Sequence, residues 1–335
     1  MNRQDRALGA LSGLALGDAL GMPTQSMSAE WIAAAYDGPI SGLVDAVADQ
    51  PIAPNMPAGS VTDDTEQALL MARLIVENDG HIDPLRLAHE LLDWEDDMRA
   101  RGSHDLLGPS TKLALEQVRS GADITTTGRT GTTNGAAMRV APVGIAHDVA
   151  EPGFAEYVLE SCRVTHNTVN GFQGAALVAA AVSYGINGCA VHDALTHAID
   201  AVDGMPAVGA WSAKANVLSR VRLALDMAKT ERDDTVFTER LRLENGTSVE
   251  ANESVAAAFA LAWRHVDDPV QALFAAASNG GDTDTIGAMA GAILGACLGP
   301  SAFPGDMVAK VVGISHLHLA DLAIELSAVR EGTSR

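Results

Sequence analysis

The stretch GGDTDTIGAMAGAILGACLG, residues 280–299, decides how this chain folds. Its last thirteen residues carry a glycine at every fourth position: Gly287, Gly291, Gly295 and Gly299. The stretch ALGALSGLALGDALG, residues 7–21, repeats that spacing with Gly9, Gly13, Gly17 and Gly21. Residues four apart lie along one ridge of a helix. Glycine costs a helix about 1 kcal/mol relative to alanine, so we expect each ridge to allow another backbone to approach closely.

Apolar periodicity and capping signals predict further helices, at residues 65–76, 85–94, 111–118, 175–184, 214–229, 254–265 and 269–277. Strict alternation of apolar and polar residues is almost absent, so no large sheet is expected. Two segments without periodicity, 37–61 and 121–134, are expected to be long ordered loops of the kind that often carries function. No flexible linker divides the sequence. The predicted fold is therefore all-α, with a single compact multi-helix domain over residues 1–335.

Composition narrows the classes of function. Hydrophobic residues make up 47% of the chain and charged residues 19%, which allows a large core. The balance of 22 Lys and Arg against 43 Asp and Glu gives a net charge of −21, which argues against a nucleic acid partner. Divalent cations remain open as ligands.

The sequence also predicts a compartment. Cys162, Cys189 and Cys297 lie far apart and form no CxxC pair, which argues against a disulfide framework or a zinc site. Asp18 and several glycines interrupt the apolar N-terminal stretch, unlike a signal peptide. The longest apolar runs are short for a bilayer span. We expect a cytoplasmic protein with no membrane partner.

Two short acidic segments carry the chemistry. SVTDDT, residues 60–65, and NGGDTDT, residues 279–285, each lead into a predicted helix. Asp and Thr serve as helix caps, but one Asp would satisfy that role. The donors are carboxylate and hydroxyl oxygens, which suit Mg²⁺ or Mn²⁺ and not zinc. Four carboxylates in one place repel strongly, so if the segments meet, a cation is nearly obligatory, and two cations a few Å apart are a natural solution.

Other common sites are excluded. An EF-hand that began at Asp282 would place Ile286 and Ile293 where calcium needs oxygen ligands. The sequence contains no GxxxxGK[ST] phosphate loop, no GxGxxG dinucleotide fingerprint and no GxSxG elbow.

The ordered set of motifs resembles the ADP-ribosylglycohydrolase family. TDDT at residues 62–65 and GDTDT at 281–285 look like its two signatures, and GLALGDALG at 13–21 is similar to its opening helix. NGAAMR at 134–139, followed by Pro142, resembles its central substrate loop. Thr165-His166 and Glu253-Ser254 match further positions. The resemblance runs from about residue 7 to 299, in the family's order.

This resemblance implies an all-helical domain that holds two Mg²⁺ or Mn²⁺ ions. The ligands it implies are Thr62, Asp63, Asp64, Asp282, Asp284 and Thr285. It further implies an ADP-ribosyl or ribosyl substrate, either on a protein side chain or in a metabolite, whose ribose diol faces the metals and whose glycosidic bond is hydrolysed. A carboxylate near that bond must transfer a proton. Asp63 or Asp64 is expected to do so, and Asp105 resembles a family position near the leaving group.

Six residues are expected to contact the substrate: Gln25, Gly108, Asn134, Gly135, Met138 and His166. The loop 128–138 would hold phosphate or ribose through its backbone N–H groups. Read without the resemblance, His166 is a structural histidine and Arg139 is a buried ion-pair partner or an anion ligand.

One position departs from the family pattern. Many relatives have Glu, which gates the substrate site, where this chain has Gln25. Gln keeps the shape and the hydrogen bonding but cannot act as a base or bind metal by charge. The leaving group therefore stays open between an arginine, serine or cysteine side chain, a nucleobase and a small nucleoside-like N-glycoside. A non-catalytic protein that binds ADP-ribose or a nucleotide is the alternative.

Overall fold

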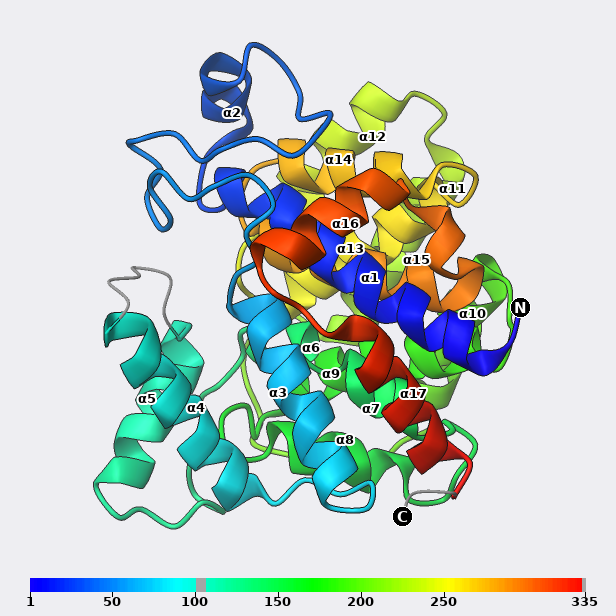
Figure 1. Ribbon diagram of the computed structural model, residues 1–335. Coiled ribbons are helices and arrows are strands. Elements are labelled where there is room, and N and C mark those ends of the chain that lie inside the picture. Colours follow the sequence, from blue (N-terminus) through cyan, green and yellow to red (C-terminus); the bar gives the residue numbers. More distant parts are fainter. Residues whose placement is uncertain (101–106, 333–335) are drawn as a thin grey trace.

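The computed structural model describes residues 1–100 and 107–332, and every regular element in these ranges is a helix (Figure 1). In chain order the α-helices are α1 (Arg3–Gly21), α2 (Ala29–Ala35), α3 (Asp63–Glu77), α4 (Pro84–Ala100), α5 (Pro109–Arg119), α6 (Gly135–Met138), α7 (Ala141–Ala146), α8 (Phe154–Cys162), α9 (Val169–Ile186), α10 (Val191–Asp203), α11 (Val217–Thr230), α12 (Asp234–Arg240), α13 (Ala251–Arg264), α14 (Pro269–Ser278), α15 (Thr283–Leu298), α16 (Gly305–Ile314) and α17 (Leu319–Arg330). The all-α prediction is confirmed.

The two glycine ridges face each other. Helices α1 and α15 run antiparallel and make the most extensive helix–helix contact in the described ranges (Figure 1). A Cβ atom added to Gly13 would overlap the carbonyl group of Gly291, and one added to Gly291 would overlap that of Gly13. Gly17 and Gly287 face each other in the same way. The expected close approach is confirmed, and each ridge is the partner of the other.

Helix α9 lies in the core beside these two helices. It is long and apolar enough to cross a membrane by length and composition, but 83% of it is buried inside the molecule. The sequence pattern predicted only residues 175–184, because Asn170 and Gln173 interrupt the apolar run. The helix begins earlier since the Thr168 hydroxyl oxygen accepts a hydrogen bond from Gly171 N at 3.0 Å, which caps it.

The helices that were not predicted are α2, α6, α7, α8, α10, α12, α16 and α17. Among them, α10 carries an apolar stripe that includes Leu195 and Ile199, so its periodicity was detectable. Helices α2, α6 and α7 have seven residues or fewer, too few for a periodic pattern to stand out. The expected loops 37–61 and 121–134 contain no regular element.

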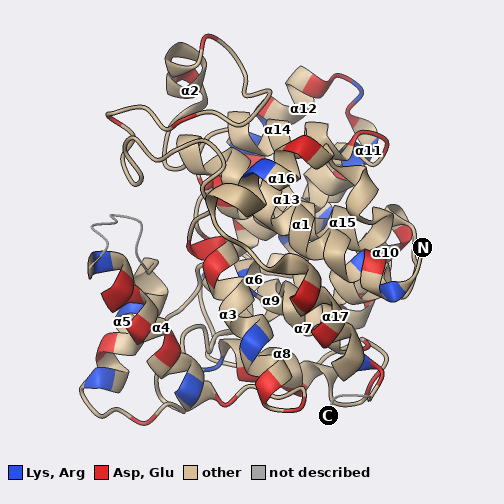
Figure 2. Cartoon of the chain, viewed as in Figure 1, with Lys and Arg blue, Asp and Glu red and all other residues tan. Residues whose placement is uncertain are grey.

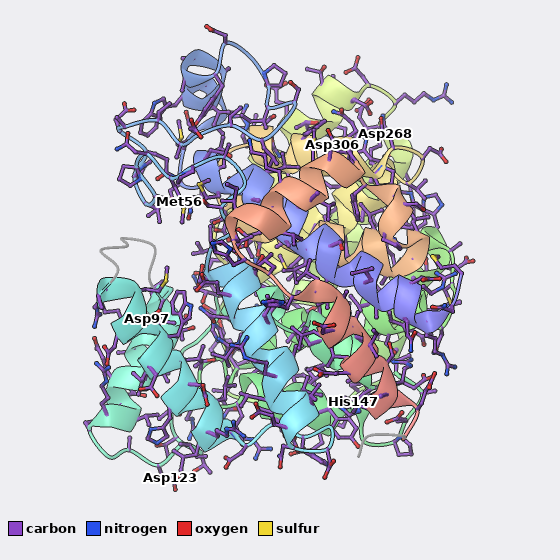
Figure 3. All side chains as sticks on the ribbon, viewed as in Figure 1. Met56, Asp97, Asp123, His147, Asp268 and Asp306 are labelled. Atoms are coloured by element: carbon purple, nitrogen blue, oxygen red, sulfur yellow. The ribbon has the colours of Figure 1, made fainter. Side chains whose placement is uncertain are left out.

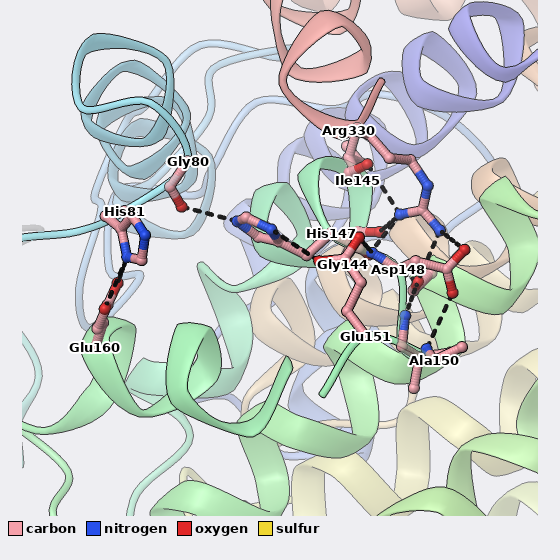
Figure 4. Close-up of polar contacts among 12 residues, drawn as sticks. Gly80, His81, Gly144, Ile145, His147, Asp148, Ala150, Glu151, Glu160 and Arg330 are labelled. Atoms are coloured by element: carbon pink, nitrogen blue, oxygen red, sulfur yellow. Dashed lines mark hydrogen bonds and ion pairs between the residues drawn. The ribbon is translucent and has the colours of Figure 1, made fainter. Parts of the chain in front are cut away.

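Two arginines bind the C-terminal ends of neighbouring helices, where carbonyl groups lack intrahelical partners. Arg330 of α17 donates to Gly144 O at 3.1 Å and Ile145 O at 3.2 Å and pairs with Asp148 at 3.3 Å (Figure 4). Arg6 of α1 donates to Gly185 O and Ala296 O, each at 3.2 Å. The first and last helices are thus fastened to the core.

Candidate functional site

The glycine contact sets the end of α1 against the start of α15. A Cβ atom on Gly21 would overlap the backbone of Asp284. The Thr283 hydroxyl donates to Gly21 O at 2.8 Å, and the Thr24 hydroxyl lies 2.9 Å from the Thr283 hydroxyl. The short turn Met22–Thr24, and Gln25 after it, therefore lie beside the second acidic segment.

Asp18 of α1 fixes the start of α3. Its carboxylate is fully buried and accepts hydrogen bonds from Thr62 N at 3.0 Å and from the Thr62 hydroxyl at 2.8 Å. It also accepts from Thr65 N at 3.1 Å and from the Thr65 hydroxyl. Burial raises the pKa of Asp18 to about 6, against the lowering effect of these hydrogen bonds. Sequence reasoning missed this role, although a carboxylate in the otherwise apolar stretch 7–21 was a visible signal.

The two acidic segments meet, as predicted. The Thr285 hydroxyl donates to Asp64 Oδ2 at 3.1 Å, which links the start of α15 directly to the start of α3. Asp64 and Asp284 are 1% and 2% exposed. Burial, and then repulsion from neighbouring carboxylates, raises the pKa of both side chains well above the usual value. Burial also raises the pKa of Asp282.

A cavity of about 280 Å³ lies over this cluster. Its acidic wall contains Asp63, Asp282, Asp284 and Thr285. Five predicted substrate contacts also line it: Gln25, Gly108, Asn134, Gly135 and Met138. The structure thus brings most of the predicted site residues around one space. Asn134 Nδ2 donates to Asp282 Oδ2 and also to the Ser254 hydroxyl at 3.0 Å, which fastens the central loop to the acidic segment.

Six further residues line the cavity and were not predicted: Ser26, Ile52, Leu107, Pro109, Thr111 and Val249. They come from different loops and helix starts and share no sequence motif. Thr133 also lines the cavity, directly before the motif NGAAMR. It lies in the predicted loop 128–138 but was not among the individual residues predicted to contact the substrate.

Some predicted residues do not line the cavity. Thr62 and Asp64 lie outside its lining. His166 is fully buried, and its Nε2 and Nδ1 atoms lie 2.9 Å from the Thr133 hydroxyl and 2.8 Å from the Thr165 hydroxyl. The structure therefore places His166 behind Thr133 and outside the lining of the cavity. Asp105 lies outside the described residues.

Two other expectations need correction. Of the loop 128–138, only residues from Thr133 onward line the cavity. Gly128 and Gly131 pack instead against the backbone of Thr165 and His166. Arg139 is fully buried, takes part in none of the ion pairs found in the described ranges and does not line this cavity. It donates hydrogen bonds to Gln67, Thr165 and, at 3.5 Å, the carbonyl oxygen of Ser161.

Gln25, which was expected to depart from the family pattern, is buried at the cavity wall with 7% of its surface exposed. Its Nε2 atom has no hydrogen-bond partner among the described residues. The backbone carbonyl oxygen of Gln25 accepts a hydrogen bond from Gln50 Nε2 at 3.0 Å, and Gln50 Oε1 accepts one from Ile52 N at 2.6 Å. The long loop 37–61 therefore holds both Gln25 and Ile52 in the wall.

The donor chemistry of the two acidic segments fits a hard divalent cation. Asp64 Oδ1 and Asp284 Oδ1 are buried, and neither accepts a hydrogen bond within the described part of the chain. A buried carboxylate oxygen without a partner is costly unless a proton or a cation balances it. No three His, Cys, Asp or Glu side chains in residues 1–100 and 107–332 are arranged to hold one ion by themselves, so threonine oxygens and water would have to complete any ligand set.

Many acidic side chains elsewhere lie on the surface. Figure 2 shows acidic residues spread over the outer helices and also at the start of α3. Asp97, Asp123, Asp268 and Asp306, which are labelled in Figure 3, are all exposed. The buried acidic cluster is therefore distinct from the solvated surface charge.

Comparison with known proteins gives consistent matches. A family model described as ADP-ribosylglycohydrolase matches residues 1–335. The uncharacterized protein YegU of Escherichia coli (strain K12) is 32% identical over 339 residues, which cover 98% of both chains. ADP-ribosylarginine hydrolase Tri1 of Pseudomonas putida (strain GB-1) is 28% identical over 93% of this chain and 76% of that protein. The solved structure of an ADP-ribosylglycohydrolase-related protein complex superposes with a TM-score of 0.68 at 24% identity and covers 99% of both chains, which shows the same fold.

Proposed function

The chain belongs to the ADP-ribosylglycohydrolase family, and from this premise we propose that it is a metal-dependent hydrolase that releases ADP-ribose from a ribosyl glycosidic bond. Membership of a glycohydrolase family supports hydrolysis of an ADP-ribosyl linkage. The observation that carries the proposal is the meeting of the two acidic segments, joined by Thr285 and Asp64, beside a cavity lined by Asn134, Gly135 and Met138.

Two Mg²⁺ or Mn²⁺ ions would be held by Thr62, Asp63, Asp64, Asp282, Asp284 and Thr285. Mg²⁺ is usually bound through one or two carboxylates and keeps several waters, so neither ion requires three carboxylates of its own. The buried oxygens Asp64 Oδ1 and Asp284 Oδ1 support this assignment. When bound, such ions would orient the ribose diol and supply a water molecule whose pKa they lower.

The remaining steps fall to side chains of the cavity. Asp63 lines it and accepts a hydrogen bond from Gln67 Nε2 at 2.9 Å, whereas Asp64 lies outside the lining. Asp63 is therefore the better placed carboxylate for proton transfer to or from the reacting groups. Departure of the leaving group gives the sugar oxocarbenium character, and the carboxylates of the acidic wall stabilise that positive charge.

The substrate class we propose is an ADP-ribosylated protein side chain or a smaller ADP-ribosyl metabolite. The relative Tri1 is named for ADP-ribosylarginine. Gln25 brings an uncharged amide with an unpartnered nitrogen to the cavity wall, and this nitrogen can donate to an acceptor atom of the substrate. A leaving group that presents an oxygen or an unprotonated ring nitrogen would satisfy this donor.

The test is product analysis by mass spectrometry on a panel of ADP-ribosyl and ribosyl glycosides, with EDTA and with added Mn²⁺. We expect release of ADP-ribose or ribose from at least one panel member, loss of this release in EDTA and its recovery with Mn²⁺. Asp63→Asn should abolish turnover, whereas the exposed Asp306→Asn should keep it. Calorimetric binding of ADP-ribose without product from any panel member would instead establish a binding protein.

A further inference from the structure

A chain of hydrogen bonds connects two residues of the cavity wall through the protein core. Its ends are Asp63, at the start of α3, and Thr133, in the loop before α6, and both line the cavity. Between them lie Gln67, Arg139, Thr165 and His166, each of which is 1% exposed or less. The links measure 2.9, 3.0, 2.6, 2.8 and 2.9 Å in order from Asp63 to Thr133.

Arg139 stands at the centre of this chain. The guanidinium group only donates hydrogen bonds. Its Nη1 donates to Gln67 Oε1, and its Nη2 donates to the Thr165 hydroxyl oxygen. Arg139 takes part in none of the ion pairs found among the described residues, although the Asp63 carboxylate attracts it from a longer distance. A fully buried cation without an ion-pair partner is costly, and an apolar side chain would fill the same space, so packing alone does not account for an arginine here.

Two branches of hydrogen bonds leave Arg139, one through Gln67 to Asp63 and one through Thr165 and His166 to Thr133. In the first branch, the residues at its two ends determine which group donates and which accepts. Arg139 can only donate and an ionised Asp63 can only accept. The Gln67 amide between them must therefore present its oxygen to Arg139 and its nitrogen to Asp63, as observed. Gln67 thereby delivers a donor to Asp63 Oδ2 and holds that carboxylate at the cavity wall.

The second branch is directed in the same manner. The Thr165 hydroxyl accepts from Arg139, and the hydrogen it carries has one acceptor among the described residues, His166 Nδ1. His166 is then the neutral tautomer that carries its hydrogen on Nε2. That hydrogen points to the Thr133 oxygen at 2.9 Å. Thr133 keeps its own hydroxyl hydrogen, and this hydrogen is left for an acceptor in the cavity.

We propose that Arg139 is a positioning residue that sets the direction of both branches, so that Asp63 is held by a donor and Thr133 presents its hydroxyl hydrogen to a phosphate or ribose oxygen of the ligand. The identity of the ligand rests on the function proposed above, whereas the direction of the hydrogen bonds does not. His166 acts through Thr133 and does not touch the substrate.

The first test is the tautomer of His166, observed by NMR on protein labelled with ¹⁵N-histidine. The signal is assigned by its loss in His166→Asn. We expect a neutral ring with hydrogen on Nε2 and a bare Nδ1 at neutral pH. In Thr165→Val this pattern should change, and Thr165→Ser should restore it. Hydrogen on Nδ1, or on both nitrogens, in the unaltered protein would overturn the proposal, whether or not any glycoside is hydrolysed.

The second test separates the branches by calorimetry with ADP-ribose and by steady-state kinetics. Thr165→Val should raise the Kd of ADP-ribose about tenfold, and Thr165→Ser should restore it. Gln67→Met should lower kcat about tenfold and leave that Kd unchanged. The matched control is Thr127→Val. Thr127 is equally buried and its hydroxyl donates to Val164 O at 2.8 Å, but it is not one of the residues linked between Asp63 and Thr133. Unchanged ADP-ribose binding in Thr165→Val, with a folded protein by thermal melting, would overturn the proposal.

Discussion

At the scale of single residues, Asp18 decides where α3 begins relative to α1. It holds the backbone and hydroxyl groups of Thr62 and Thr65 without reaching the cavity. Residues that orient metal ligands typically change metal affinity 10–100-fold when they are replaced. We therefore predict that Asp18→Asn weakens Mn²⁺ binding at least about tenfold, as measured by calorimetry. Asp306→Asn serves as the exposed control, and equal affinities in both variants would contradict the role of Asp18.

The pKa values of the buried carboxylates predict how metal stabilisation depends on pH. Burial raises the pKa of Asp18 to about 6, and the pKa values of Asp64 and Asp284 are raised as well. The folded metal-free protein holds these protons more tightly than the unfolded chain does, so the protons stabilise the fold. This contribution to the free energy of unfolding is fully present below about pH 4, the ordinary pKa of Asp. It is lost as pH rises through the folded pKa values, for Asp18 at about 6.

A divalent cation competes with those protons. The rise in Tm on addition of Mn²⁺ should therefore be larger at about pH 7.5 than at about pH 5, by several degrees. Burial lowers the pKa of His147, so this residue destabilises the fold when pH falls below about 6.5, which is opposite to the effect of the carboxylates. Comparing Tm with and without Mn²⁺ at the same pH cancels this effect of His147. Differential scanning calorimetry measures this, and an equal or smaller shift at the higher pH would contradict the assignment.

Individual site residues differed in how far the sequence predicted them. The acidic segments carried a recognisable pattern, and so did the loop around Asn134. The positioning roles of Asp18 and Arg139 were not predicted, because they depend on partners such as Thr62, Gln67 and Thr165 that no local pattern connects to them. For Arg139 the sequence suggested an ion pair or an anion ligand instead. His166 was placed at the ligand because a motif gives position along the chain and not depth beneath the surface.

At the scale of elements, the paired glycine ridges make a sharp prediction. Gly13→Ala would push a methyl group into the carbonyl of Gly291. Overpacking of this kind costs about 1–3 kcal/mol or more, which outweighs the gain of up to about 1 kcal/mol in helix propensity. Gly313 of α16 is the control, since an added Cβ there meets no atom within 4 Å.

Urea denaturation should thus show a lower free energy of unfolding for Gly13→Ala and an equal or higher one for Gly313→Ala. Destabilisation of both variants by the same amount would mean that the ridge contact has no special role.

The four-residue spacing predicted close packing of α1 and α15, since it is a local property. It did not predict that the two ridges face each other, because pairing depends on the whole fold.

At the scale of the whole molecule, the outer helices are fastened by buried arginines. The Arg330 side chain is 2% exposed. It donates to Ile145 O at the end of α7, as Figure 4 shows, and to Asn187 Oδ1 at the end of α9, at 3.0 Å. We predict that Arg330→Gln lowers the free energy of unfolding by about 2 kcal/mol or more, because several carbonyls lose their partner. Its Mn²⁺ affinity should stay unchanged, since Arg330 lines no part of the cavity.

The control is Arg119→Gln, which breaks the exposed pair with Asp96. Exposed ion pairs contribute about 0–1 kcal/mol, so this variant should unfold nearly as the unaltered protein does. A similar loss in both variants by urea denaturation would argue against a specific role for Arg330.

The account as a whole depends on the junction of α1, α3 and α15 being a site for divalent cations. The most direct test is a calorimetric titration of the metal-free protein with Mn²⁺, carried out beside the variant Asp64→Asn/Asp284→Asn. We predict two Mn²⁺ ions bound per unaltered chain and none bound at this site in the variant. Absence of saturable binding by the unaltered chain, or unchanged binding by the variant, would contradict the central claim.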